Sequence, residues 1–98
     1  MAYDIEYTES ALEDIAYFKK YERVIILDAV DQQLMHQPLV KVRNRKPLES
    51  NELGSWELRV GKYRIFYDVD SDESLVIIKA TGWKEHNMLY IRGKEYKL

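Results

Sequence analysis

The sequence predicts an α+β fold in which an N-terminal strand and a helical hairpin pack on a small, mostly antiparallel sheet. Three observations predict it. Apolar residues alternate over positions 3–7, they recur at helical spacing between positions 10 and 37, and they alternate again over 56–67 around a Gly-Lys step. The expected order of elements is β-α-α-β-β-β. The length of 98 residues fits one domain, residues 1–98.

The first strand is expected over residues 3–7, where apolar and acidic side chains alternate. Thr8 or Ser10 then caps a helix, and Ser10-x-x-Glu13 has the spacing of a capping box. The helical period places three apolar side chains on the buried side, Leu12, Ile15 and Phe18. It places three charged side chains outside, Glu13, Asp14 and Lys19.

A second helix is expected from about Tyr21 to Gln37, with Ile26 or Leu27, Val30 and Leu34 as its apolar stripe. Pro38 ends it, because the residue before a proline is disfavoured in the helical region. The join near residues 20–23 is short, so the two helices form an antiparallel hairpin. Residues 38–55 are mostly loop, with at most a short extended piece over 41–46.

The clearest pattern is a β-hairpin over residues 56–67. Two alternating runs flank Gly61-Lys62, and glycine in the first position predicts a type II′ turn. That turn fixes the register. The buried face then carries three opposed pairs: Val60 and Tyr63, Leu58 and Ile65, Trp56 and Tyr67. The other face carries two pairs: Arg59 opposite Arg64 and Glu57 opposite Phe66.

Residues 75–81 are nearly continuous and apolar, which predicts a central strand covered on both faces. Gly82 ends or bulges that strand. The tail over 89–98 contains a second Gly-Lys step. It predicts either a hairpin that pairs Arg92 with Glu95 and Ile91 with Tyr96, or a terminal helix.

The balance of charge excludes several classes of protein. With 15 Lys and Arg against 17 Asp and Glu, the net charge is −2, unlike that of proteins held to nucleic acid or membranes by bulk charge. No apolar run is long enough to span a membrane, and the first residues do not resemble a signal peptide. The absence of cysteine excludes disulfides, thiolate zinc sites and cysteine nucleophiles, and fits a cytoplasmic protein.

The charge is divided along the chain. Residues 1–37 hold eight acids and three bases, a net of −5, whereas residues 38–98 hold twelve bases and nine acids, a net of +3. Such asymmetry indicates either a surface for a charged partner or two solvated faces of an ordinary domain. The two histidines are distant in sequence, so neither a metal nor another cofactor is expected.

The opposed arginines are the strongest functional feature of the predicted hairpin. Like charges directly opposite one another destabilise a sheet, so Arg59 and Arg64 are candidates to hold a phosphate or carboxylate. Alternatively, Glu57 and Asp68 neutralise them in a surface ladder. Beyond the central strand, Lys84 offers a cation, His86 offers an imidazole and Tyr90 can stack on a base, unless these are ordinary surface residues.

The segment Leu53-Gly-Ser-Trp-Glu-Leu-Arg-Val-Gly-Lys-Tyr-Arg-Ile-Phe-Tyr67, with Val-Ile-Ile-Lys-Ala-Thr-Gly82 after it, resembles the RelE/ParE toxin superfamily. The resemblance implies the toxin of a bacterial type II toxin–antitoxin pair, with a cognate antitoxin as partner. RelE-type members enter the ribosomal A site and cut mRNA without a metal, through attack of the 2′-hydroxyl on the adjacent phosphate. ParE-like members inhibit DNA gyrase instead.

The resemblance also implies roles for individual residues. Arg64 matches an arginine that holds the phosphate, Lys84 a general acid or cation, Tyr90 a base-stacking tyrosine and Arg59 a basic strand position. Active members carry lysines where this chain has Ser55 and Glu57. Four loop residues can contact RNA and the ribosome or replace those lysines: Lys41, Arg43, Arg45 and Lys46. Glu57 as a base and His86 are further candidates.

Those residues lead us to expect a ribosome-dependent endoribonuclease. A ParE-like gyrase inhibitor and an inactive antitoxin-binding domain are the alternatives.

Overall fold

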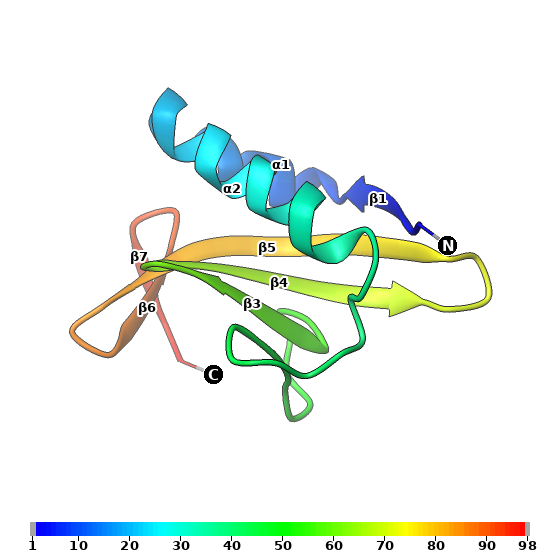
Figure 1. The fold of residues 1–98 in the computed structure, drawn as a ribbon. Helices are drawn as coiled ribbons and strands as arrows, with labels where there is room; N and C mark the ends of the chain where they lie inside the picture. The colour runs from blue at the N-terminus through cyan, green and yellow to red at the C-terminus, as the bar shows by residue number, and fades with distance from the viewer. Residues whose placement is uncertain (1, 98) are drawn as a thin grey trace.

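The computed structural model describes residues 2–97. In chain order the elements are β1 (Asp4–Tyr7), α1 (Glu9–Ala16), α2 (Lys20–Leu34), β2 (Arg45–Pro47), β3 (Trp56–Val60), β4 (Tyr63–Asp70), β5 (Leu75–Glu85), β6 (Met88–Ile91) and β7 (Lys94–Tyr96). The strands form one sheet in the order β2-β3-β4-β5-β6-β7, and β1 also pairs with β5. Both helices cover one face of that sheet (Figure 1). The expected α+β architecture is confirmed, with β2, β6 and β7 as additional short strands.

The first helix begins at Thr8, whose hydroxyl oxygen accepts a hydrogen bond from the Ala11 backbone N–H at 3.0 Å. Ser10 lies inside the helix, so the capping box predicted there is wrong. The orientation predicted for this helix is also partly wrong: Leu12 is 54% exposed and Asp14 is 1% exposed. Ala11, Asp14 and Ile15 form the buried face. The burial of Asp14 is possible because its carboxylate forms a long-range ion pair.

The second helix buries Ile26, Val30 and Leu34 as predicted. It ends at Leu34, before the predicted limit of Gln37. The carbonyl of Met35 accepts a hydrogen bond from the N–H of Tyr3 at 2.6 Å, so a contact with the segment before β1 takes the place of a further turn. The join between the helices lies at residues 17–19, and α2 runs back along the same face of the sheet (Figure 1).

The β3–β4 hairpin has the predicted register at all five pairs, from Trp56 opposite Tyr67 to Val60 opposite Tyr63. Gly61 has a φ of 57°, as the first turn residue of a type II′ turn requires. Of the region predicted as mostly loop, only β2 forms a strand, antiparallel to β3. The helix-facing side of the hairpin joins the main core with Ile26, Val30 and Leu34.

The strand β5 is longer than predicted, because it continues through Gly82 to Glu85. Along one edge it pairs with β4. Along the other edge its first half pairs in parallel with β1, and its last residues pair with β6. Gly82 neither ends nor bulges the strand, and the irregularity lies between Phe66 and Tyr67 of β4. Glycine is needed at position 82 because a Cβ there would collide with the carbonyl oxygen of Tyr90.

The tail forms a hairpin rather than a terminal helix. Its pairs are Leu89 with Tyr96, Tyr90 with Glu95 and Ile91 with Lys94. Both predicted pairs, Arg92 with Glu95 and Ile91 with Tyr96, are therefore wrong. The turn falls on Arg92 and Gly93, which have φ values of 51° and 77°. Two positive φ values are typical of a type I′ turn, which moves the turn by one residue. This hairpin contributes to a second core cluster, formed by Leu53, Phe66, Ala80 and Leu89.

Candidate functional site

Arg59 and Arg64 lie directly opposite one another on β3 and β4, on the sheet face that also carries Glu57. Arg59 is exposed, whereas the side chain of Arg64 is only 7% exposed. Nη1 of Arg64 donates to the carbonyl oxygens of Gly61 and Tyr63 at 2.8 and 2.9 Å. These two bonds, together with burial, hold the guanidinium in one position.

A second nitrogen of Arg64, Nε, has no hydrogen bond. It is buried and lies 3.8 Å from Oε1 of Glu57, whose side chain is 4% exposed. Burial lowers the pKa of Arg64, and the charge of Arg59 lowers it further, while Glu57 opposes both. A buried cation with an incomplete set of partners is typical of a functional site. Glu57 is therefore a buried counter-charge, out of reach of a bulky substrate.

Arg59 borders a shallow hollow of about 400 Å³ at the turn of the β3–β4 hairpin. Arg43, Asn44 and Gly61 line the rest of it. The N–H of Arg59 donates to the carbonyl oxygen of Asn44 at 2.8 Å, and the Asn44 side chain donates to Gln33 on α2. Two guanidinium groups and no carboxylate line this hollow, so it favours an anion.

The basic loop residues divide into two groups. Lys41, Arg43 and Lys46 are exposed. Arg45 is 7% exposed and its Nη1 donates to the carbonyl oxygen of Gln33 at 2.6 Å, near the C-terminal end of α2. Arg45 therefore ties β2 to the helix and is not displayed at the surface. Sequence reasoning could not separate it from its basic neighbours, because the four residues differ only in their position along a short loop.

The three candidates beyond Gly82 lie on different parts of the sheet. Gly82 pairs with Arg64, so alternation places Lys84 on the face of Arg64. Tyr90 pairs with Trp83 on the opposite face, and the two rings stack at 5.5 Å between centroids. His86 is exposed in the β5–β6 turn, where its φ is 53°. The structure therefore brings Arg59, Arg64 and Lys84 to one face and leaves Tyr90 on the other.

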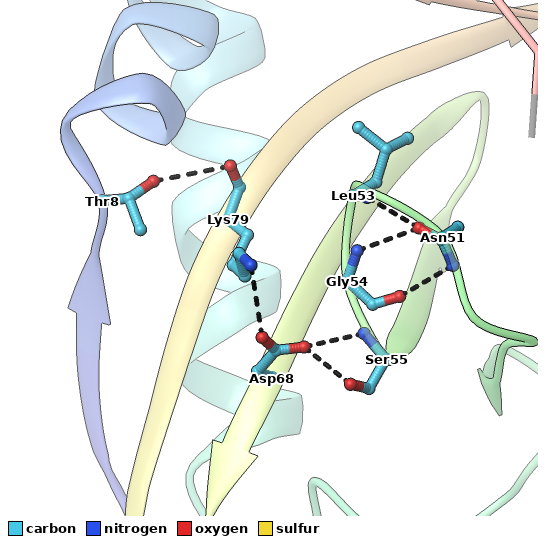
Figure 2. Close-up of polar contacts among 7 residues, drawn as sticks. All are labelled: Thr8, Asn51, Leu53, Gly54, Ser55, Asp68 and Lys79. Atoms are coloured by element: carbon cyan, nitrogen blue, oxygen red, sulfur yellow. Dashed lines mark hydrogen bonds and ion pairs between the residues drawn. The ribbon is translucent and has the colours of Figure 1, made fainter.

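The loop before the hairpin is fastened to the sheet by Asp68 (Figure 2). One oxygen of Asp68 accepts hydrogen bonds from the N–H and the hydroxyl of Ser55, both at 2.8 Å. The other lies 3.4 Å from Nζ of Lys79 on β5. Although burial raises the pKa of Asp68, the bonds from Ser55 and the charge of Lys79 hold it below its usual value. Asp68 and Ser55 thus form a structural latch, and Asp68 does not neutralise the arginine pair.

An ion pair that sequence reasoning missed joins the two ends of the fold. Nε of Arg92 lies 2.8 Å from Oδ1 of Asp14, and Oδ2 accepts a hydrogen bond from the N–H of Thr81 at 3.1 Å. Nη1 of Arg92 also donates to Glu13 at 2.9 Å. Burial raises the pKa of Asp14, while Thr81 and Arg92 oppose the rise. Spacing gives no signal for contacts between residues this distant in the chain.

Two negative findings complete the description of the site. Within residues 2–97, no helix is long and apolar enough to cross a membrane. Over the same part of the chain, no three His, Asp or Glu side chains gather in a group that could hold a metal ion.

Comparison with solved structures gives the same fold. The toxin–antitoxin complex RelBE2 from Mycobacterium tuberculosis contains a chain 24% identical, with a TM-score of 0.74 over 86% of this chain and 100% of that one. The archaeal RelE–RelB complex from Pyrococcus horikoshii matches at 18% identity and a TM-score of 0.69, over 88% and 99%. The intact E. coli RelBE complex matches at 21% and 0.54, over 87% and 100%. No curated protein sequence matches significantly.

The fold is the small α+β fold of the chains in these complexes. The sequence model described as "ParE toxin of type II toxin-antitoxin system, parDE" matches residues 5–82, from β1 to Gly82 in β5. The chain belongs to this family of type II toxins.

Proposed function

We propose that this toxin is a ribosome-dependent endoribonuclease that cleaves mRNA in the A site. The observation that supports the proposal is the pair of Arg59 and Arg64. Like charges directly opposite in a sheet cost stability, and Arg64 adds the cost of a buried Nε without a hydrogen bond. An anion bound at the exposed Arg59 offsets the repulsion between the two arginines. The phosphate of RNA is the anion that the superfamily resemblance suggests.

In the proposed reaction the 2′-hydroxyl of a nucleotide attacks the adjacent phosphorus. The bond from phosphorus to the 5′-oxygen of the next nucleotide breaks, which leaves a 2′,3′-cyclic phosphate and a free 5′-hydroxyl. Arg59, which is exposed, stabilises the charge that develops on the phosphorane, and the buried Arg64 adds its positive charge without touching the substrate. Lys84, exposed on the same face, supplies a proton to the leaving oxygen.

The proton of the 2′-hydroxyl must pass to a base. Glu57 and Arg45 are buried, which disfavours both as groups that touch RNA. Lys41, Lys46 and His86 are exposed and remain the candidates. Lys41, Lys46 and Arg43 also extend the basic surface toward the ribosome and the message, whose phosphates attract it.

A second candidate function is inhibition of DNA gyrase by binding, as in ParE-like members of the superfamily. The position of Tyr90 favours it. Its ring stacks on Trp83, on the face opposite Arg64, so it is poorly placed to stack on a base whose phosphate lies at the arginine pair. The burial of Glu57 also favours it, since the carboxylate expected as a base is then kept from the substrate.

Besides the ribosome and mRNA, we propose a cognate antitoxin as a partner of this protein. The three solved structures compared above are toxin–antitoxin complexes. Residues 38–98 carry a net charge of +3 from twelve bases and nine acids, so we propose that an acidic, partly amphipathic segment of the antitoxin folds on this half of the toxin.

Induction of the toxin without its antitoxin separates the two functions. We expect new mRNA 5′ ends at codons that occupy the A site, mapped over the first minutes after induction. The Arg59→Ala variant, which lacks an exposed arginine of the pair, should lose these ends. Gyrase-dependent DNA breaks without new mRNA ends would reject the nuclease in favour of the gyrase inhibitor.

A further inference from the structure

A second hollow lies at the other face of the sheet, away from the arginine pair. It occupies about 420 Å³ between the join of the two helices and the turn of the β3–β4 hairpin. Trp83 and Tyr17 form one side, and their rings stack at 5.8 Å with an angle of 14° between planes. Phe18, packed edge-on against Trp83 at 5.7 Å, lies beneath. The volume falls within the range of small-molecule sites.

Flat aromatic surface is available at the mouth of this hollow. Tyr17 is 55% exposed and Tyr21 is 63% exposed, and both line it. Trp83 stacks on both Tyr17 and Tyr90. This ladder fixes the ring of Trp83, whereas Tyr21 has no stacking partner among residues 2–97. An exposed tyrosine beside a fixed aromatic wall can stack on a planar ring.

The floor of the hollow presents a charged acceptor. Oε2 of Glu22 accepts a hydrogen bond from the Tyr63 hydroxyl at 2.7 Å, and Oε1 accepts one from the N–H of Lys19 at 3.2 Å. Each carboxylate oxygen can accept one more hydrogen bond. The bond from Tyr63 outweighs burial and lowers the pKa of Glu22, so the group is a carboxylate at neutral pH.

Two ammonium groups stand at the rim. Nζ of Lys62 lies 3.8 Å from Oε2 of Glu22 and 5.6 Å from the centre of the Tyr63 ring, with 56% of the side chain exposed. Lys19 also lines this hollow. With Glu22 the set carries a net charge of +1, so one cation remains for an anionic ligand.

We propose that this hollow binds a nucleotide, with the base against Tyr17 and Tyr21 and the phosphate at Lys19 and Lys62. The N–H edge of a base supplies the donor that Glu22 lacks, and the phosphate supplies the anion for the lysines. An aromatic side chain of a peptide fills the same space but carries no anionic group to pair with the two ammonium groups. The nucleotide is either free or part of a nucleic-acid strand, because both share this chemistry. The proposal does not depend on the proposed nuclease activity.

Binding is measured by NMR on the complete chain, with the indole N–H of Trp83 as the reporter. The probes are GMP, AMP, CMP and UMP, a single-stranded RNA hexanucleotide, and a short peptide with one tyrosine between aspartates. We expect saturable shifts of Trp83 with at least one mononucleotide, at a dissociation constant below about 1 mM. If the hexanucleotide alone causes these shifts, the ligand is a nucleotide within a strand.

Two variants test the residues at the mouth of the hollow. Lys62→Gln and Tyr21→Ala should each weaken nucleotide binding about tenfold, through loss of a phosphate contact and of a stacking surface. Lys79→Gln is the matched control, because Lys79 is a partly exposed lysine paired with Asp68 elsewhere on the sheet. Equal weakening by Lys62→Gln and Lys79→Gln overturns the proposal. So does binding of the peptide alone, or of none of the probes at millimolar concentration.

Discussion

Asp14 and Arg92 fasten the C-terminal hairpin to the first helix. The carboxylate is 1% exposed and Nε of the arginine lies 2.8 Å from it, while 43% of the arginine side chain is exposed. A buried carboxylate that loses its partner is costly, so this contact couples the β6–β7 turn to the main core.

Arg92→Ala should lower the free energy of unfolding by about 2 kcal/mol, because Asp14 keeps only the bond from Thr81. The pKa of Asp14 should rise further, since the charge of Arg92 opposes the effect of burial. Urea unfolding measures the first effect and carboxyl NMR titration the second. Lys94→Ala, an exposed change in the same hairpin, is the control. An unchanged stability in Arg92→Ala would show that the pair contributes nothing.

Tyr63→Phe tests the hydrogen bond from Tyr63 to Glu22, which is 2.7 Å long. We expect a loss of about 1 kcal/mol at pH 7. The folded-state pKa of Glu22 lies below its ordinary value of 4.5, so ionised Glu22 stabilises the fold above that pH, and the effect is lost as the pH falls through the folded-state value.

The variant should therefore differ most from the parent at neutral pH and converge with it in acid. Thermal unfolding between pH 3 and 7 measures the difference. A constant gap in melting temperature across this range would contradict the assignment of the effect to Glu22.

Arg64→Ala should destabilise the protein by about 3 kcal/mol, because it leaves Glu57 buried without a counter-charge. Relief of the repulsion between Arg64 and Arg59 acts in the opposite direction but is smaller. Adding Glu57→Gln should restore part of the loss, since the uncompensated charge is removed. Denaturant unfolding of the single and double variants measures the coupling. Additive losses would show that the two side chains act independently.

Arg59→Ala should separate activity from stability. Arg59 is exposed, so the free energy of unfolding should change by less than about 0.5 kcal/mol. Cleavage of ribosome-bound mRNA should fall at least about tenfold, through loss of phosphorane stabilisation. Primer extension on an actively translated message measures cleavage, with Lys97→Ala as the control. Full cleavage by Arg59→Ala would remove this residue from the proposed site.

Local patterns predicted some elements and not others, for identifiable reasons. The register of β3 and β4 followed from alternation and from Gly61, both contained in a short segment. The same logic misplaced the tail turn, because Arg92 adopts a positive φ that glycine alone was expected to have. Its side chain is held by Glu13 and Asp14, which no local pattern reveals.

The sequence predicted where the arginines of the candidate site lie on the strands, but not which groups surround them. The spacing predicted that Arg64 lies opposite Arg59. It did not predict the hydrogen bonds that Arg64 donates to the carbonyl oxygens of Gly61 and Tyr63. The burial of Glu57 and Arg45 likewise depends on the packed structure, because no local pattern distinguishes them from the exposed charged residues nearby, such as Arg59 and Lys46. A charged residue on an alternating strand is ordinarily expected at the surface.

One edge of β5 pairs with both β1 and β6, and this arrangement has a consequence for the synthesis of the chain. Residues 4–7 have no strand partner until residues 75–78 have been made. The helices emerge first, with the apolar side chains of their buried faces still facing water. Pairing between segments so distant in sequence is slow, because the loop between them must close before any contact is gained. The sheet is therefore completed only after residues 75–78 have been made, and until then β1 lacks the strand beside which it lies in the finished fold.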